Sequence, residues 1–317
     1  MKVLITGGAG FIGSNLVGAL LEDSRFSLVR VFDNLATGFE KNIEEFYPNS
    51  KFEFIKGDIR SYEDCLDACK GINRVSHQAA LGSVPRSVKD PITTNEVNIG
   101  GTLNIFNAAK EQGVDRVIYA ASSSTYGDSQ GLPKVEEKIG NPLSPYAVTK
   151  YVMELYAKVF HDLYSLDLVG FRYFNVYGPK QDPSGAYAAV IPLFFKHALD
   201  GTNPIINGDG SYSRDFTYIQ NVINANILGL TTDNKKGLNQ VYNIACGNRT
   251  TLLELWEGIK NVCASESQAV HGPNRPGDIP HSLADVSKAI RLLNYNPKVH
   301  LEEGLSESYK WYKKNNL

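Results

Sequence analysis

The first half of the chain alternates short apolar runs, rich in β-branched residues, with longer amphipathic stretches. The runs predict strands at Lys2–Thr6, Val29–Phe32, Phe52–Lys56, Arg74–His77, Arg116–Ala121 and Leu168–Phe174. The stretches between them predict helices at Phe11–Leu21, Ser61–Cys69, Asn95–Gln112 and Tyr146–Tyr164. Strands that alternate with helices need crossover connections, and right-handed crossovers build a parallel, doubly wound sheet. Helices on both faces of such a sheet explain why the strands are continuous apolar runs.

The rhythm changes after about Gly178. A turn-rich break at Pro179–Gly185 precedes the other elements that the pattern predicts. These are helices at Val190–Asp200, Leu252–Cys263 and Val286–Leu293 and a strand at Gln240–Ala245. We therefore predict an α/β domain over residues 1–178 and a smaller, mixed α/β substrate domain over 179–317, some segments of which pack back on the first. A cleft between the two is the default place for a substrate.

Composition is that of a soluble globular protein, with 42% hydrophobic and 21% charged residues in a chain of 317. Lys and Arg number 32 against 34 Asp and Glu, so no overall basic excess exists to bind nucleic acid or an anionic membrane. No apolar run approaches membrane-spanning length, and the first residues show no signal-peptide pattern. We expect a cytoplasmic protein that binds neither nucleic acid nor membrane.

The cysteines do not indicate a metal site. Cys65 and Cys69 stand one helical turn apart, but neither Cys246, Cys263 nor a cluster of histidines lies nearby in sequence to complete a zinc tetrad. Reduced thiols in a cytosolic protein are the simpler interpretation. We therefore expect no metal.

A glycine-rich segment, Thr6–Gly13, joins the first predicted strand to the first predicted helix. It satisfies G-x-G-x-x-G at Gly8, Gly10 and Gly13, and G-x-x-G-x-x-G at Gly7, Gly10 and Gly13. Glycines there allow a tight turn, let a pyrophosphate approach the backbone and pack the helix on the strand. The helix N-terminus then offers N–H groups to the phosphates. In this strand–turn–helix context the motif predicts a Rossmann-type dinucleotide site.

Two carboxylates follow later strands. Asp33 stands 20 residues after Gly13 at the end of the second strand, where it would bond the adenosine ribose hydroxyls and repel a 2′-phosphate. NAD is therefore favoured over NADP. Asp58 follows the third strand and is placed to accept from the adenine amino group, although a turn aspartate is a strong alternative for this position.

Candidate catalytic groups follow the fifth strand. Ser122–Gly127 is rich in hydroxyls, and Tyr146 and Lys150 are four residues apart on one face of a predicted helix. An ammonium group there favours the phenolate of a tyrosine, whose ordinary pKa is ~10, and brings it toward the range of a general base. A serine hydroxyl can hold the same substrate oxygen. Such a Tyr–Lys pair is usually a surface contact, but together with the dinucleotide motif it indicates catalysis.

The succession of these motifs along the chain resembles that of the extended short-chain dehydrogenase/reductase family, and within this family that of the nucleotide-sugar 4-epimerases. The resemblance covers nearly the whole chain, and it includes His77–Ala80, Asn98 with Gly101-Thr102, Arg172–Pro179, Arg214–Phe216 and Arg275–Asp278. The segments most similar to bacterial UDP-N-acetylglucosamine 4-epimerases are Ser144–Lys150, Gln181–Pro183 and Ala186–Pro192.

The resemblance implies a mechanism. Tyr146 would remove the 4-hydroxyl proton of a UDP-sugar while bound NAD takes the C4 hydride, and the 4-keto sugar would turn over and receive the hydride on its other face. The family's catalytic hydroxyl lies four residues before the Tyr of a Tyr-Gly pair, which is Ser122 here, with Ser123 nearly as good and Ser124 not excluded. Lys150 would also bond the nicotinamide ribose.

The resemblance also implies two sets of binding residues. Those for NAD are Gly7, Gly10, Phe11, Ile12, Gly13, Asp33, Asn34, Thr37, Gly38, Asp58, Ile59, Gln78, Ala79, Ala80, Asn98, Tyr146, Lys150, Tyr173 and Val176. Those for the substrate are Ser83, Asn175, Gln181, Val190, Asn207, Arg214, Arg275, Asp278 and Ser282. Within the second set, Arg214 and Arg275 match arginines that clamp the diphosphate, since a guanidinium suits two oxygens.

Three positions, Ser282, Ser123 and Ser124, bear on the substrate and the reaction, and a fourth, Asn221, departs from the family pattern. Epimerases restricted to non-acetylated hexoses place a bulky Tyr where this chain has Ser282, and a serine leaves room for a 2-acetamido group. Dehydratases of the family have Asp-Glu where this chain has Ser123 and Ser124, so elimination is not expected. Asn221 replaces the family's usual aspartate, and we expect no catalytic consequence.

The favoured interpretation is a UDP-N-acetylglucosamine/UDP-N-acetylgalactosamine 4-epimerase. The same mechanism on UDP-N-acetylglucosaminuronate, with Arg86 near a C6 carboxylate, is an alternative, as are a net reductase and a non-catalytic NAD-sensing protein. The intact Ser122, Tyr146 and Lys150 argue against the sensor. The helices at Asn95–Gln112 and Tyr146–Tyr164 have more apolar surface than one sheet face needs, and family members pair them between subunits, so we predict a homodimer.

Overall fold

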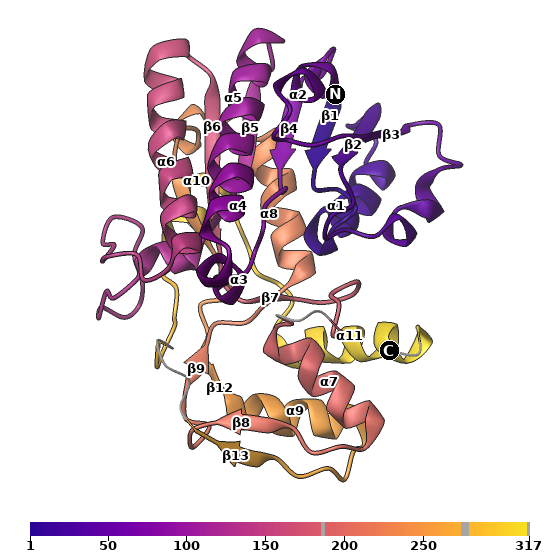
Figure 1. Ribbon diagram of the computed structural model, residues 1–317, viewed down its shortest axis with the longest axis vertical. Coiled ribbons are helices and arrows are strands. Elements are labelled where there is room, and N and C mark those ends of the chain that lie inside the picture. Colours follow the sequence, from indigo (N-terminus) through magenta and orange to yellow (C-terminus); the bar gives the residue numbers. More distant parts are fainter. Residues whose placement is uncertain (185–187, 274–278, 316–317) are drawn as a thin grey trace.

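The computed structural model describes residues 1–184, 188–273 and 279–315. Its central sheet is parallel, with seven strands in the order β11-β6-β5-β4-β1-β2-β3 (Figure 1). This arrangement confirms the doubly wound, Rossmann-type α/β class, and the ends of each predicted strand agree to within one residue. The strands are β1 (Lys2–Thr6), β2 (Leu28–Asp33), β3 (Phe52–Lys56), β4 (Arg74–His77), β5 (Arg116–Ser122), β6 (Asp167–Tyr173) and β11 (Val241–Ile244).

Different helices cover the two faces of this sheet. Alternate residues of a strand point to opposite faces, so Val3 and Ile5 of β1 join one core while Leu4 joins the other. Burial on both faces is the physical reason for the apolar runs. The first core includes α1 (Phe11–Glu22) and α8 (Ile219–Thr231), and the second includes α2 (Tyr62–Cys69), α5 (Gly101–Glu111) and α6 (Pro145–Tyr164). Figure 1 shows α5 and α6 side by side over the sheet.

The predicted helix Asn95–Gln112 differs from the observed one. It begins earlier, as α4 (Pro91–Asn95), and passes through a π-helical turn at Glu96–Gly100 into α5. Asn98 lies in that turn and is fully buried; its side-chain amide accepts the Leu81 N–H at 2.8 Å and donates to the Leu81 carbonyl at 3.3 Å. The wider turn therefore holds the loop that follows β4, and the hydrophobic pattern alone does not predict it.

Several elements after residue 178 return to the central sheet. Strand β11 pairs with β6, and α8 and α10 (Ser287–Leu293) pack against it. The sequence pattern predicts α7 (Val190–Asp200) and α9 (Leu252–Cys263) to the residue but misses α8 and α11 (Leu301–Lys314). The remaining elements are α3 (Val84–Lys89), β7 (Val176–Tyr177), α7 (Val190–Asp200), β8 (Ile205–Asn207), β9 (Ser213–Arg214), β10 (Thr217–Tyr218), β12 (Thr250–Thr251), α9 (Leu252–Cys263), β13 (Val270–Gly272) and α11 (Leu301–Lys314).

Asn221 has a structural role that explains why an amide stands there. It is fully buried in α8, its Nδ2 donates to the Val299 carbonyl at 2.7 Å, and its Oδ1 accepts the Val299 N–H at 3.2 Å. A carboxylate can accept but cannot donate, so an ionised aspartate would lose half of this pair. The amide ties α8 to the segment that precedes α11.

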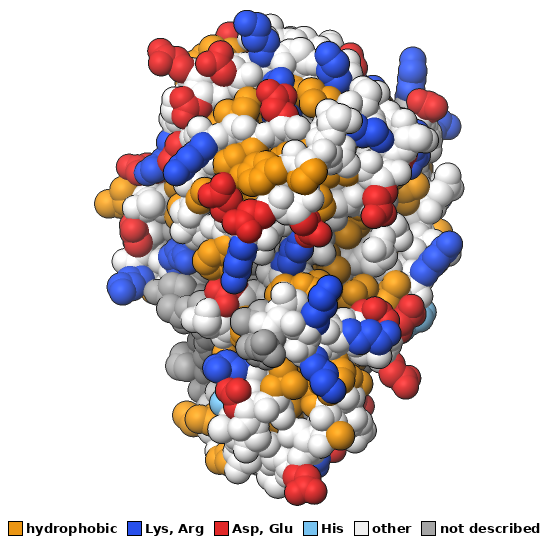
Figure 2. Space-filling model, turned by 90° about the vertical axis from the view of Figure 1, so that its right-hand side faces the viewer, with side chains coloured by type: hydrophobic (Ala, Val, Ile, Leu, Met, Phe, Trp, Pro, Cys, Tyr) orange, Lys and Arg blue, Asp and Glu red, His pale blue; other side chains and the backbone are white. Residues whose placement is uncertain are grey.

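The face of the molecule drawn in Figure 2 carries charges of both signs without a large patch of either. Figure 2 shows lysine and arginine side chains interspersed with aspartate and glutamate over one whole face. Within the described ranges, no helix is both long and apolar enough to cross a bilayer.

Candidate active site

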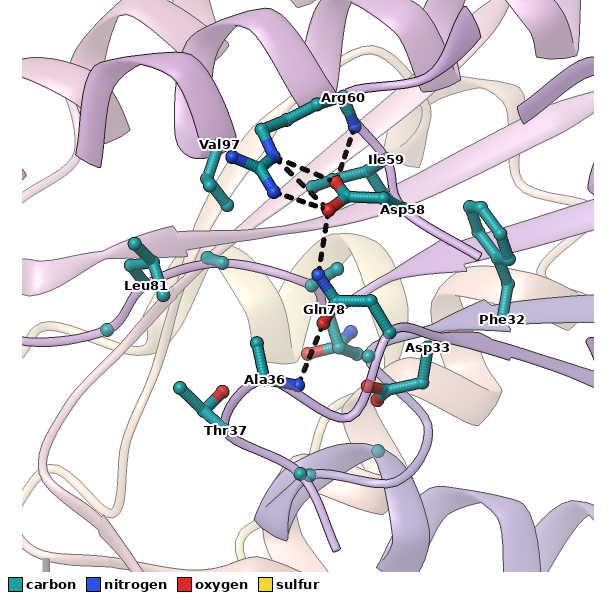
Figure 3. A pocket seen from close by; sticks show the side chains of 18 of the residues that line it. Phe32, Asp33, Ala36, Thr37, Asp58, Ile59, Arg60, Gln78, Leu81 and Val97 are labelled. Carbon is teal, nitrogen blue, oxygen red and sulfur yellow. Dashed lines mark hydrogen bonds and ion pairs between the residues drawn. The ribbon is translucent and has the colours of Figure 1, made fainter. Parts of the chain in front are cut away.

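A cavity of about 360 Å³ opens at the carboxyl ends of β1 to β4 (Figure 3). Ligands of doubly wound sheets bind at this edge. The predicted cofactor residues that line it are Gly7, Gly10, Phe11, Ile12, Gly13, Asp33, Asn34, Thr37, Gly38, Asp58, Ile59, Gln78, Ala79 and Ala80. Sequence analysis missed Phe32, Ala36, Gly57, Arg60, Leu81, Gly82, Thr93 and Val97. Most of these are apolar residues or glycines beside the motifs, which have no chemical signature of their own.

The glycine loop is shaped for close backbone approach. Gly7 has φ +68°, and a Cβ added there would lie 2.7 Å from the Ala79 nitrogen. A Cβ on Gly13 would lie 2.2 Å from the Gly7 carbonyl oxygen, so no side chain fits either position. Gly8 instead faces the Val31 side chain and does not line the cavity. The spacing that forms the cradle is therefore Gly7, Gly10 and Gly13, and the residues present suit a dinucleotide pyrophosphate at the start of α1.

Asp33 is held in place by backbone amides. Its Oδ2 accepts the Ala9 N–H at 2.9 Å and its Oδ1 accepts the Leu35 N–H at 2.8 Å. Burial raises the pKa of this carboxyl, while the two N–H groups lower it. Each oxygen retains a lone pair for a ribose hydroxyl, and an ionised carboxylate here disfavours a 2′-phosphate.

Asp58 is a fixed acceptor on the cavity wall. Figure 3 shows its carboxylate facing the Arg60 guanidinium, at 2.7 Å from Nη2, and it also accepts the Asn34 side-chain amide at 2.9 Å. The hydrogen bond from Arg60 is the main reason that the pKa of Asp58 falls to about 2. Asp58 is therefore ionised at neutral pH, in a position to accept from an amino group.

Ser122, Tyr146 and Lys150 come together where β5 ends beside α6. The helix begins favourably, because the Ser144 side chain caps it and Pro145 occupies its first turn. Lys150 is 2% exposed, and its Nζ donates to the Ala120 carbonyl at 2.7 Å and lies 5.9 Å from the centre of the Tyr146 ring.

The electrostatics of these groups correct one expectation. Burial lowers the pKa of Lys150 to about 7. Burial also raises the pKa of Tyr146, and the group that opposes this rise is the Ser122 hydroxyl, through a hydrogen bond, rather than Lys150. The expected lowering of the Tyr146 pKa by the ammonium group is therefore wrong for the protein alone. The contact also distinguishes the serines, because it joins Ser122 to the phenol.

Other predicted cofactor residues lie outside the cavity lining. Tyr173 lies behind the lining residue Gln78, and its hydroxyl donates to Gln78 Oε1 at 3.3 Å. The same hydroxyl accepts a hydrogen bond from the Asn226 side chain at 2.8 Å. Asn98 does not line the cavity but hydrogen-bonds the backbone of Leu81, which does. Val176 starts β7, beyond the cavity.

Some predicted substrate residues gather around β9. Arg214 Nη1 and the Ser282 N–H both donate to the Ser213 carbonyl at 3.0 Å. The Asn175 side chain donates to the Asp215 carbonyl at 3.2 Å, one residue further.

The other predicted substrate residues are more dispersed. Ser83 caps α3, Gln181 donates to the Val176 carbonyl, Val190 starts α7, and Asn207 ends β8. Arg275 and Asp278 lie outside the described residues.

Residues 3–245 match the family model described as the NAD-dependent epimerase/dehydratase family. The chain belongs to this family. NAD is its cofactor, as the cradle of Gly7, Gly10 and Gly13 and the Asp33 carboxylate predict.

Similar proteins extend over the whole chain. A putative UDP-glucose 4-epimerase of Methanocaldococcus jannaschii is 37% identical over 316 residues, 99% of each chain. A UDP-N-acetylglucosamine 4-epimerase from Methanobrevibacter ruminantium M1, in complex with UDP-N-acetylmuramic acid, is 41% identical with a TM-score of 0.93 and coverage of 99% and 98%. A Bacillus cereus UDP-glucuronic acid 4-epimerase with UDP-glucuronic acid and NAD is 34% identical, with a TM-score of 0.91 and coverage of 99% and 100%.

Proposed function

We propose that this enzyme of the NAD-dependent UDP-sugar 4-epimerase type interconverts UDP-N-acetylglucosamine and UDP-N-acetylgalactosamine. The observation that carries the proposal is the convergence of Ser122, at the end of β5, with Tyr146 and the buried Lys150 of α6, whose Nζ donates to the Ala120 carbonyl of β5 at 2.7 Å. The similarity to a UDP-N-acetylglucosamine 4-epimerase at 41% identity supports the acetamido sugar. The small side chain of Ser282, whose backbone N–H shares the Ser213 carbonyl with Arg214, supports it as well.

The chemistry needs a base that also returns a proton. Tyr146 as phenolate accepts the proton of the sugar 4-hydroxyl and gives it back after the 4-keto sugar has turned over. When bound, NAD⁺ would accept the hydride from C4 of the sugar, and its reduced form would return that hydride to the opposite face of the 4-keto sugar. Ser122 donates to the phenolate and keeps its oxygen in place, and Lys150 adds positive charge beside the site in its protonated form. Each turnover is redox-neutral.

The residues that follow Ser122 argue against elimination. A dehydratase must move protons at two further sugar carbons, which takes an acid and a base in addition to the tyrosine. Ser123 and Ser124 occupy the two positions where family dehydratases have Asp and Glu. The two serine hydroxyls cannot act as the acid and the base near neutral pH in place of those carboxyl groups. The reaction therefore ends in epimerisation.

A test is to give the enzyme UDP-N-acetylglucosamine, UDP-glucose and UDP-N-acetylglucosaminuronate separately and to resolve the products by NMR. We expect UDP-N-acetylgalactosamine, formed much faster than UDP-galactose and without net NADH. Turnover of the uronate alone would retain the mechanism but move the specificity to C6, an outcome in keeping with the similarity to a UDP-glucuronic acid 4-epimerase. No turnover of any of them would reject the proposal in favour of a sensor or a reductase.

We further propose that the enzyme is a homodimer through α6, whereas α5, which the sequence also suggested, has no exposed large hydrophobic residue among Gly101–Glu111. Apolar side chains of α6, and of α3 and α4, which pack against it, are exposed to solvent. A stripe of this kind is unusual on a monomer and marks an interface. Its residues are Val84, Val88, Ile92, Val148, Leu155, Val159, Leu163 and Tyr164.

The cysteines support a proposal for the cellular compartment. Cys65, Cys69, Cys246 and Cys263 are all free. Unpaired thiols are typical of reducing compartments. We propose that the enzyme acts in the cytoplasm.

A further inference from the structure

The serines that follow β5 are not equivalent. The hydroxyl of Ser124 donates to Ser122 Oγ at 2.9 Å, and the Ser124 backbone N–H donates to the same oxygen at 3.1 Å. A hydroxyl oxygen has two lone pairs and one proton. Both lone pairs of Ser122 Oγ are therefore occupied by Ser124, and its own proton is free to point elsewhere.

The direction of these bonds is determined by the charge on Tyr146. Ser122 ends β5, which packs against α6, and its hydroxyl lies close enough to the Tyr146 phenol in the first turn of that helix to share a hydrogen bond with it. When Tyr146 is a phenolate, its oxygen can only accept, so Ser122 must donate its proton to it. Ser122 then has no proton for Ser124. The 2.9 Å contact must therefore be a donation from Ser124 to Ser122.

We propose that Ser124 is a positioning residue for proton transfer, whose hydroxyl holds Ser122 as the donor to the phenolate form of Tyr146. The inference rests on the proposed function, in which Tyr146 is the base. Because both lone pairs of Ser122 are occupied, the 4-hydroxyl of the sugar gives its proton directly to Tyr146. The sugar O–H bond breaks as the phenol O–H bond forms, and the reverse happens when the proton is returned.

The local backbone does not need this hydroxyl. The short helical turn at Ser123–Tyr126 is capped by the Ser122 side chain, which accepts the N–H of residue 124. Any residue at position 124 except proline provides that N–H. The Ser124 side chain is half-buried and adds a second donor in a chain of hydroxyls, where each bond strengthens the next. The Ser124 hydroxyl should therefore change the pKa of Tyr146, through the hydrogen-bonded hydroxyls, and should not change the fold of the turn.

Ser124→Thr and Ser124→Val provide a matched test, because threonine and valine have the same shape and differ in the hydroxyl. The titration of Tyr146 is followed by phenolate absorbance in the NAD-bound enzyme, with Tyr146→Phe as the blank. We expect the midpoint in the Val variant to lie roughly half to one pH unit above that in the Thr variant. The Thr variant should titrate like the unmodified enzyme. Equal midpoints in the two variants would overturn the proposal.

Turnover gives a second measurement that separates this inference from the proposed function. The acid limb of the kcat–pH profile should move upward by the same amount in the Val variant, with KM nearly unchanged. A loss of kcat in the Val variant without any shift of the limb would indicate a steric role and contradict the proposal. The absorbance titration needs no sugar, so a midpoint difference in an enzyme that turns over none of the tested sugars would support the role of Ser124 and reject the substrate assignment.

Discussion

Arg172 in β6 and Glu154 in α6 form a two-pronged ion pair in the protein interior. Nε of Arg172 lies 2.8 Å from Oε1 of Glu154, Nη2 lies 2.7 Å from Oε2, and the two side chains are 4% and 7% exposed. The guanidinium also donates to the Glu136 carbonyl at 2.9 Å and lies 4.8 Å from the centre of the Tyr126 ring. The pair joins the helix that holds Tyr146 to the strand that ends at Tyr173.

Removing one member of this pair should destabilise the fold strongly. Glu154→Met leaves an uncompensated guanidinium in the interior, at a cost of about 3–5 kcal/mol in the free energy of unfolding. The double variant Glu154→Met/Arg172→Met should lose less than the sum of the single changes, since neither charge remains. Urea unfolding measures both quantities.

A control lies on the same helix. Lys158 and Asp162 form an exposed pair at 2.7 Å, and Asp162→Ala should leave the free energy of unfolding nearly unchanged. Equal losses for the buried and the exposed pair would contradict this account.

The buried Lys150 should make the protein without NAD less stable at neutral pH than at high pH. The pKa of Lys150 is lowered by burial from 10.5 to about 7. Below pH 7 the lysine is charged in both the folded and the unfolded state, and the folded state bears the desolvation cost. Between pH 7 and 10.5 the folded state alone has lost the proton, so stability rises with pH.

Lys150→Met should therefore raise the free energy of unfolding by roughly 2–4 kcal/mol at pH 6.5 and remove this pH dependence, while it abolishes turnover. Unfolding curves from pH 6.5 to 8.5, not above the ordinary pKa of the thiols of the unfolded chain, test this. Lys158→Met, which replaces an exposed lysine of the same helix, should leave the curve nearly unchanged. A Lys150→Met variant as pH-dependent as the original would refute the assignment of the effect to Lys150.

Ser282 should control the size of the sugar 2-substituent. Ser282→Tyr fills the space beside Arg214, so kcat/KM for UDP-N-acetylglucosamine should fall at least ~10-fold relative to that for UDP-glucose. Ser282→Ala, which adds no volume, should retain the preference. Competition between the two sugars in one NMR tube measures the ratio directly. A ratio that the Tyr variant leaves unchanged would remove Ser282 from the sugar pocket.

A charge in the α6 stripe should give monomers. Leu155 and Val159 are 49% and 47% exposed, and Leu155→Glu places a carboxylate in the proposed interface. Sedimentation should show a dimer for the unmodified enzyme and a monomer for this variant. Leu253→Glu in α9, where the leucine is 40% exposed, is the matched control and should remain dimeric. A monomeric unmodified enzyme would disprove the interface.

The parts of the fold that depend on local pattern are predictable from the sequence. The strands are buried on both faces, so they read as apolar runs, and helix α6 has a capping serine followed by a proline. The sequence pattern misses helix α8 because two buried residues on its inner side, Asn221 and Asn226, are polar and interrupt the apolar periodicity. Both make hydrogen bonds to distant parts of the chain, at Val299 and Tyr173. Only the tertiary structure supplies those partners.

The same division holds for the site. The glycine cradle and the Tyr146–Lys150 pair are predictable because a loop and one helical turn determine their geometry, although the pair indicates catalysis only together with the glycine motif. Which of the serines at 122–124 approaches Tyr146, and which one hydrogen-bonds Ser122, is not predictable, because it depends on how the end of β5 packs against α6. Arg60 is missed because its role depends on the ion pair with Asp58. The Arg172–Glu154 pair joins neighbouring elements whose contact no local pattern reveals.

The most direct test of the mechanism uses UDP-N-acetylglucosamine that carries deuterium at C4. If the hydride leaves C4 and returns to the opposite face of the same sugar, the UDP-N-acetylgalactosamine formed retains deuterium at C4, and neither NADH nor labelled water accumulates. NMR reads the position of the label and the C4 configuration in one experiment. Loss of the deuterium to water, or a dehydrated 4-keto-6-deoxy sugar as the product, would contradict the account.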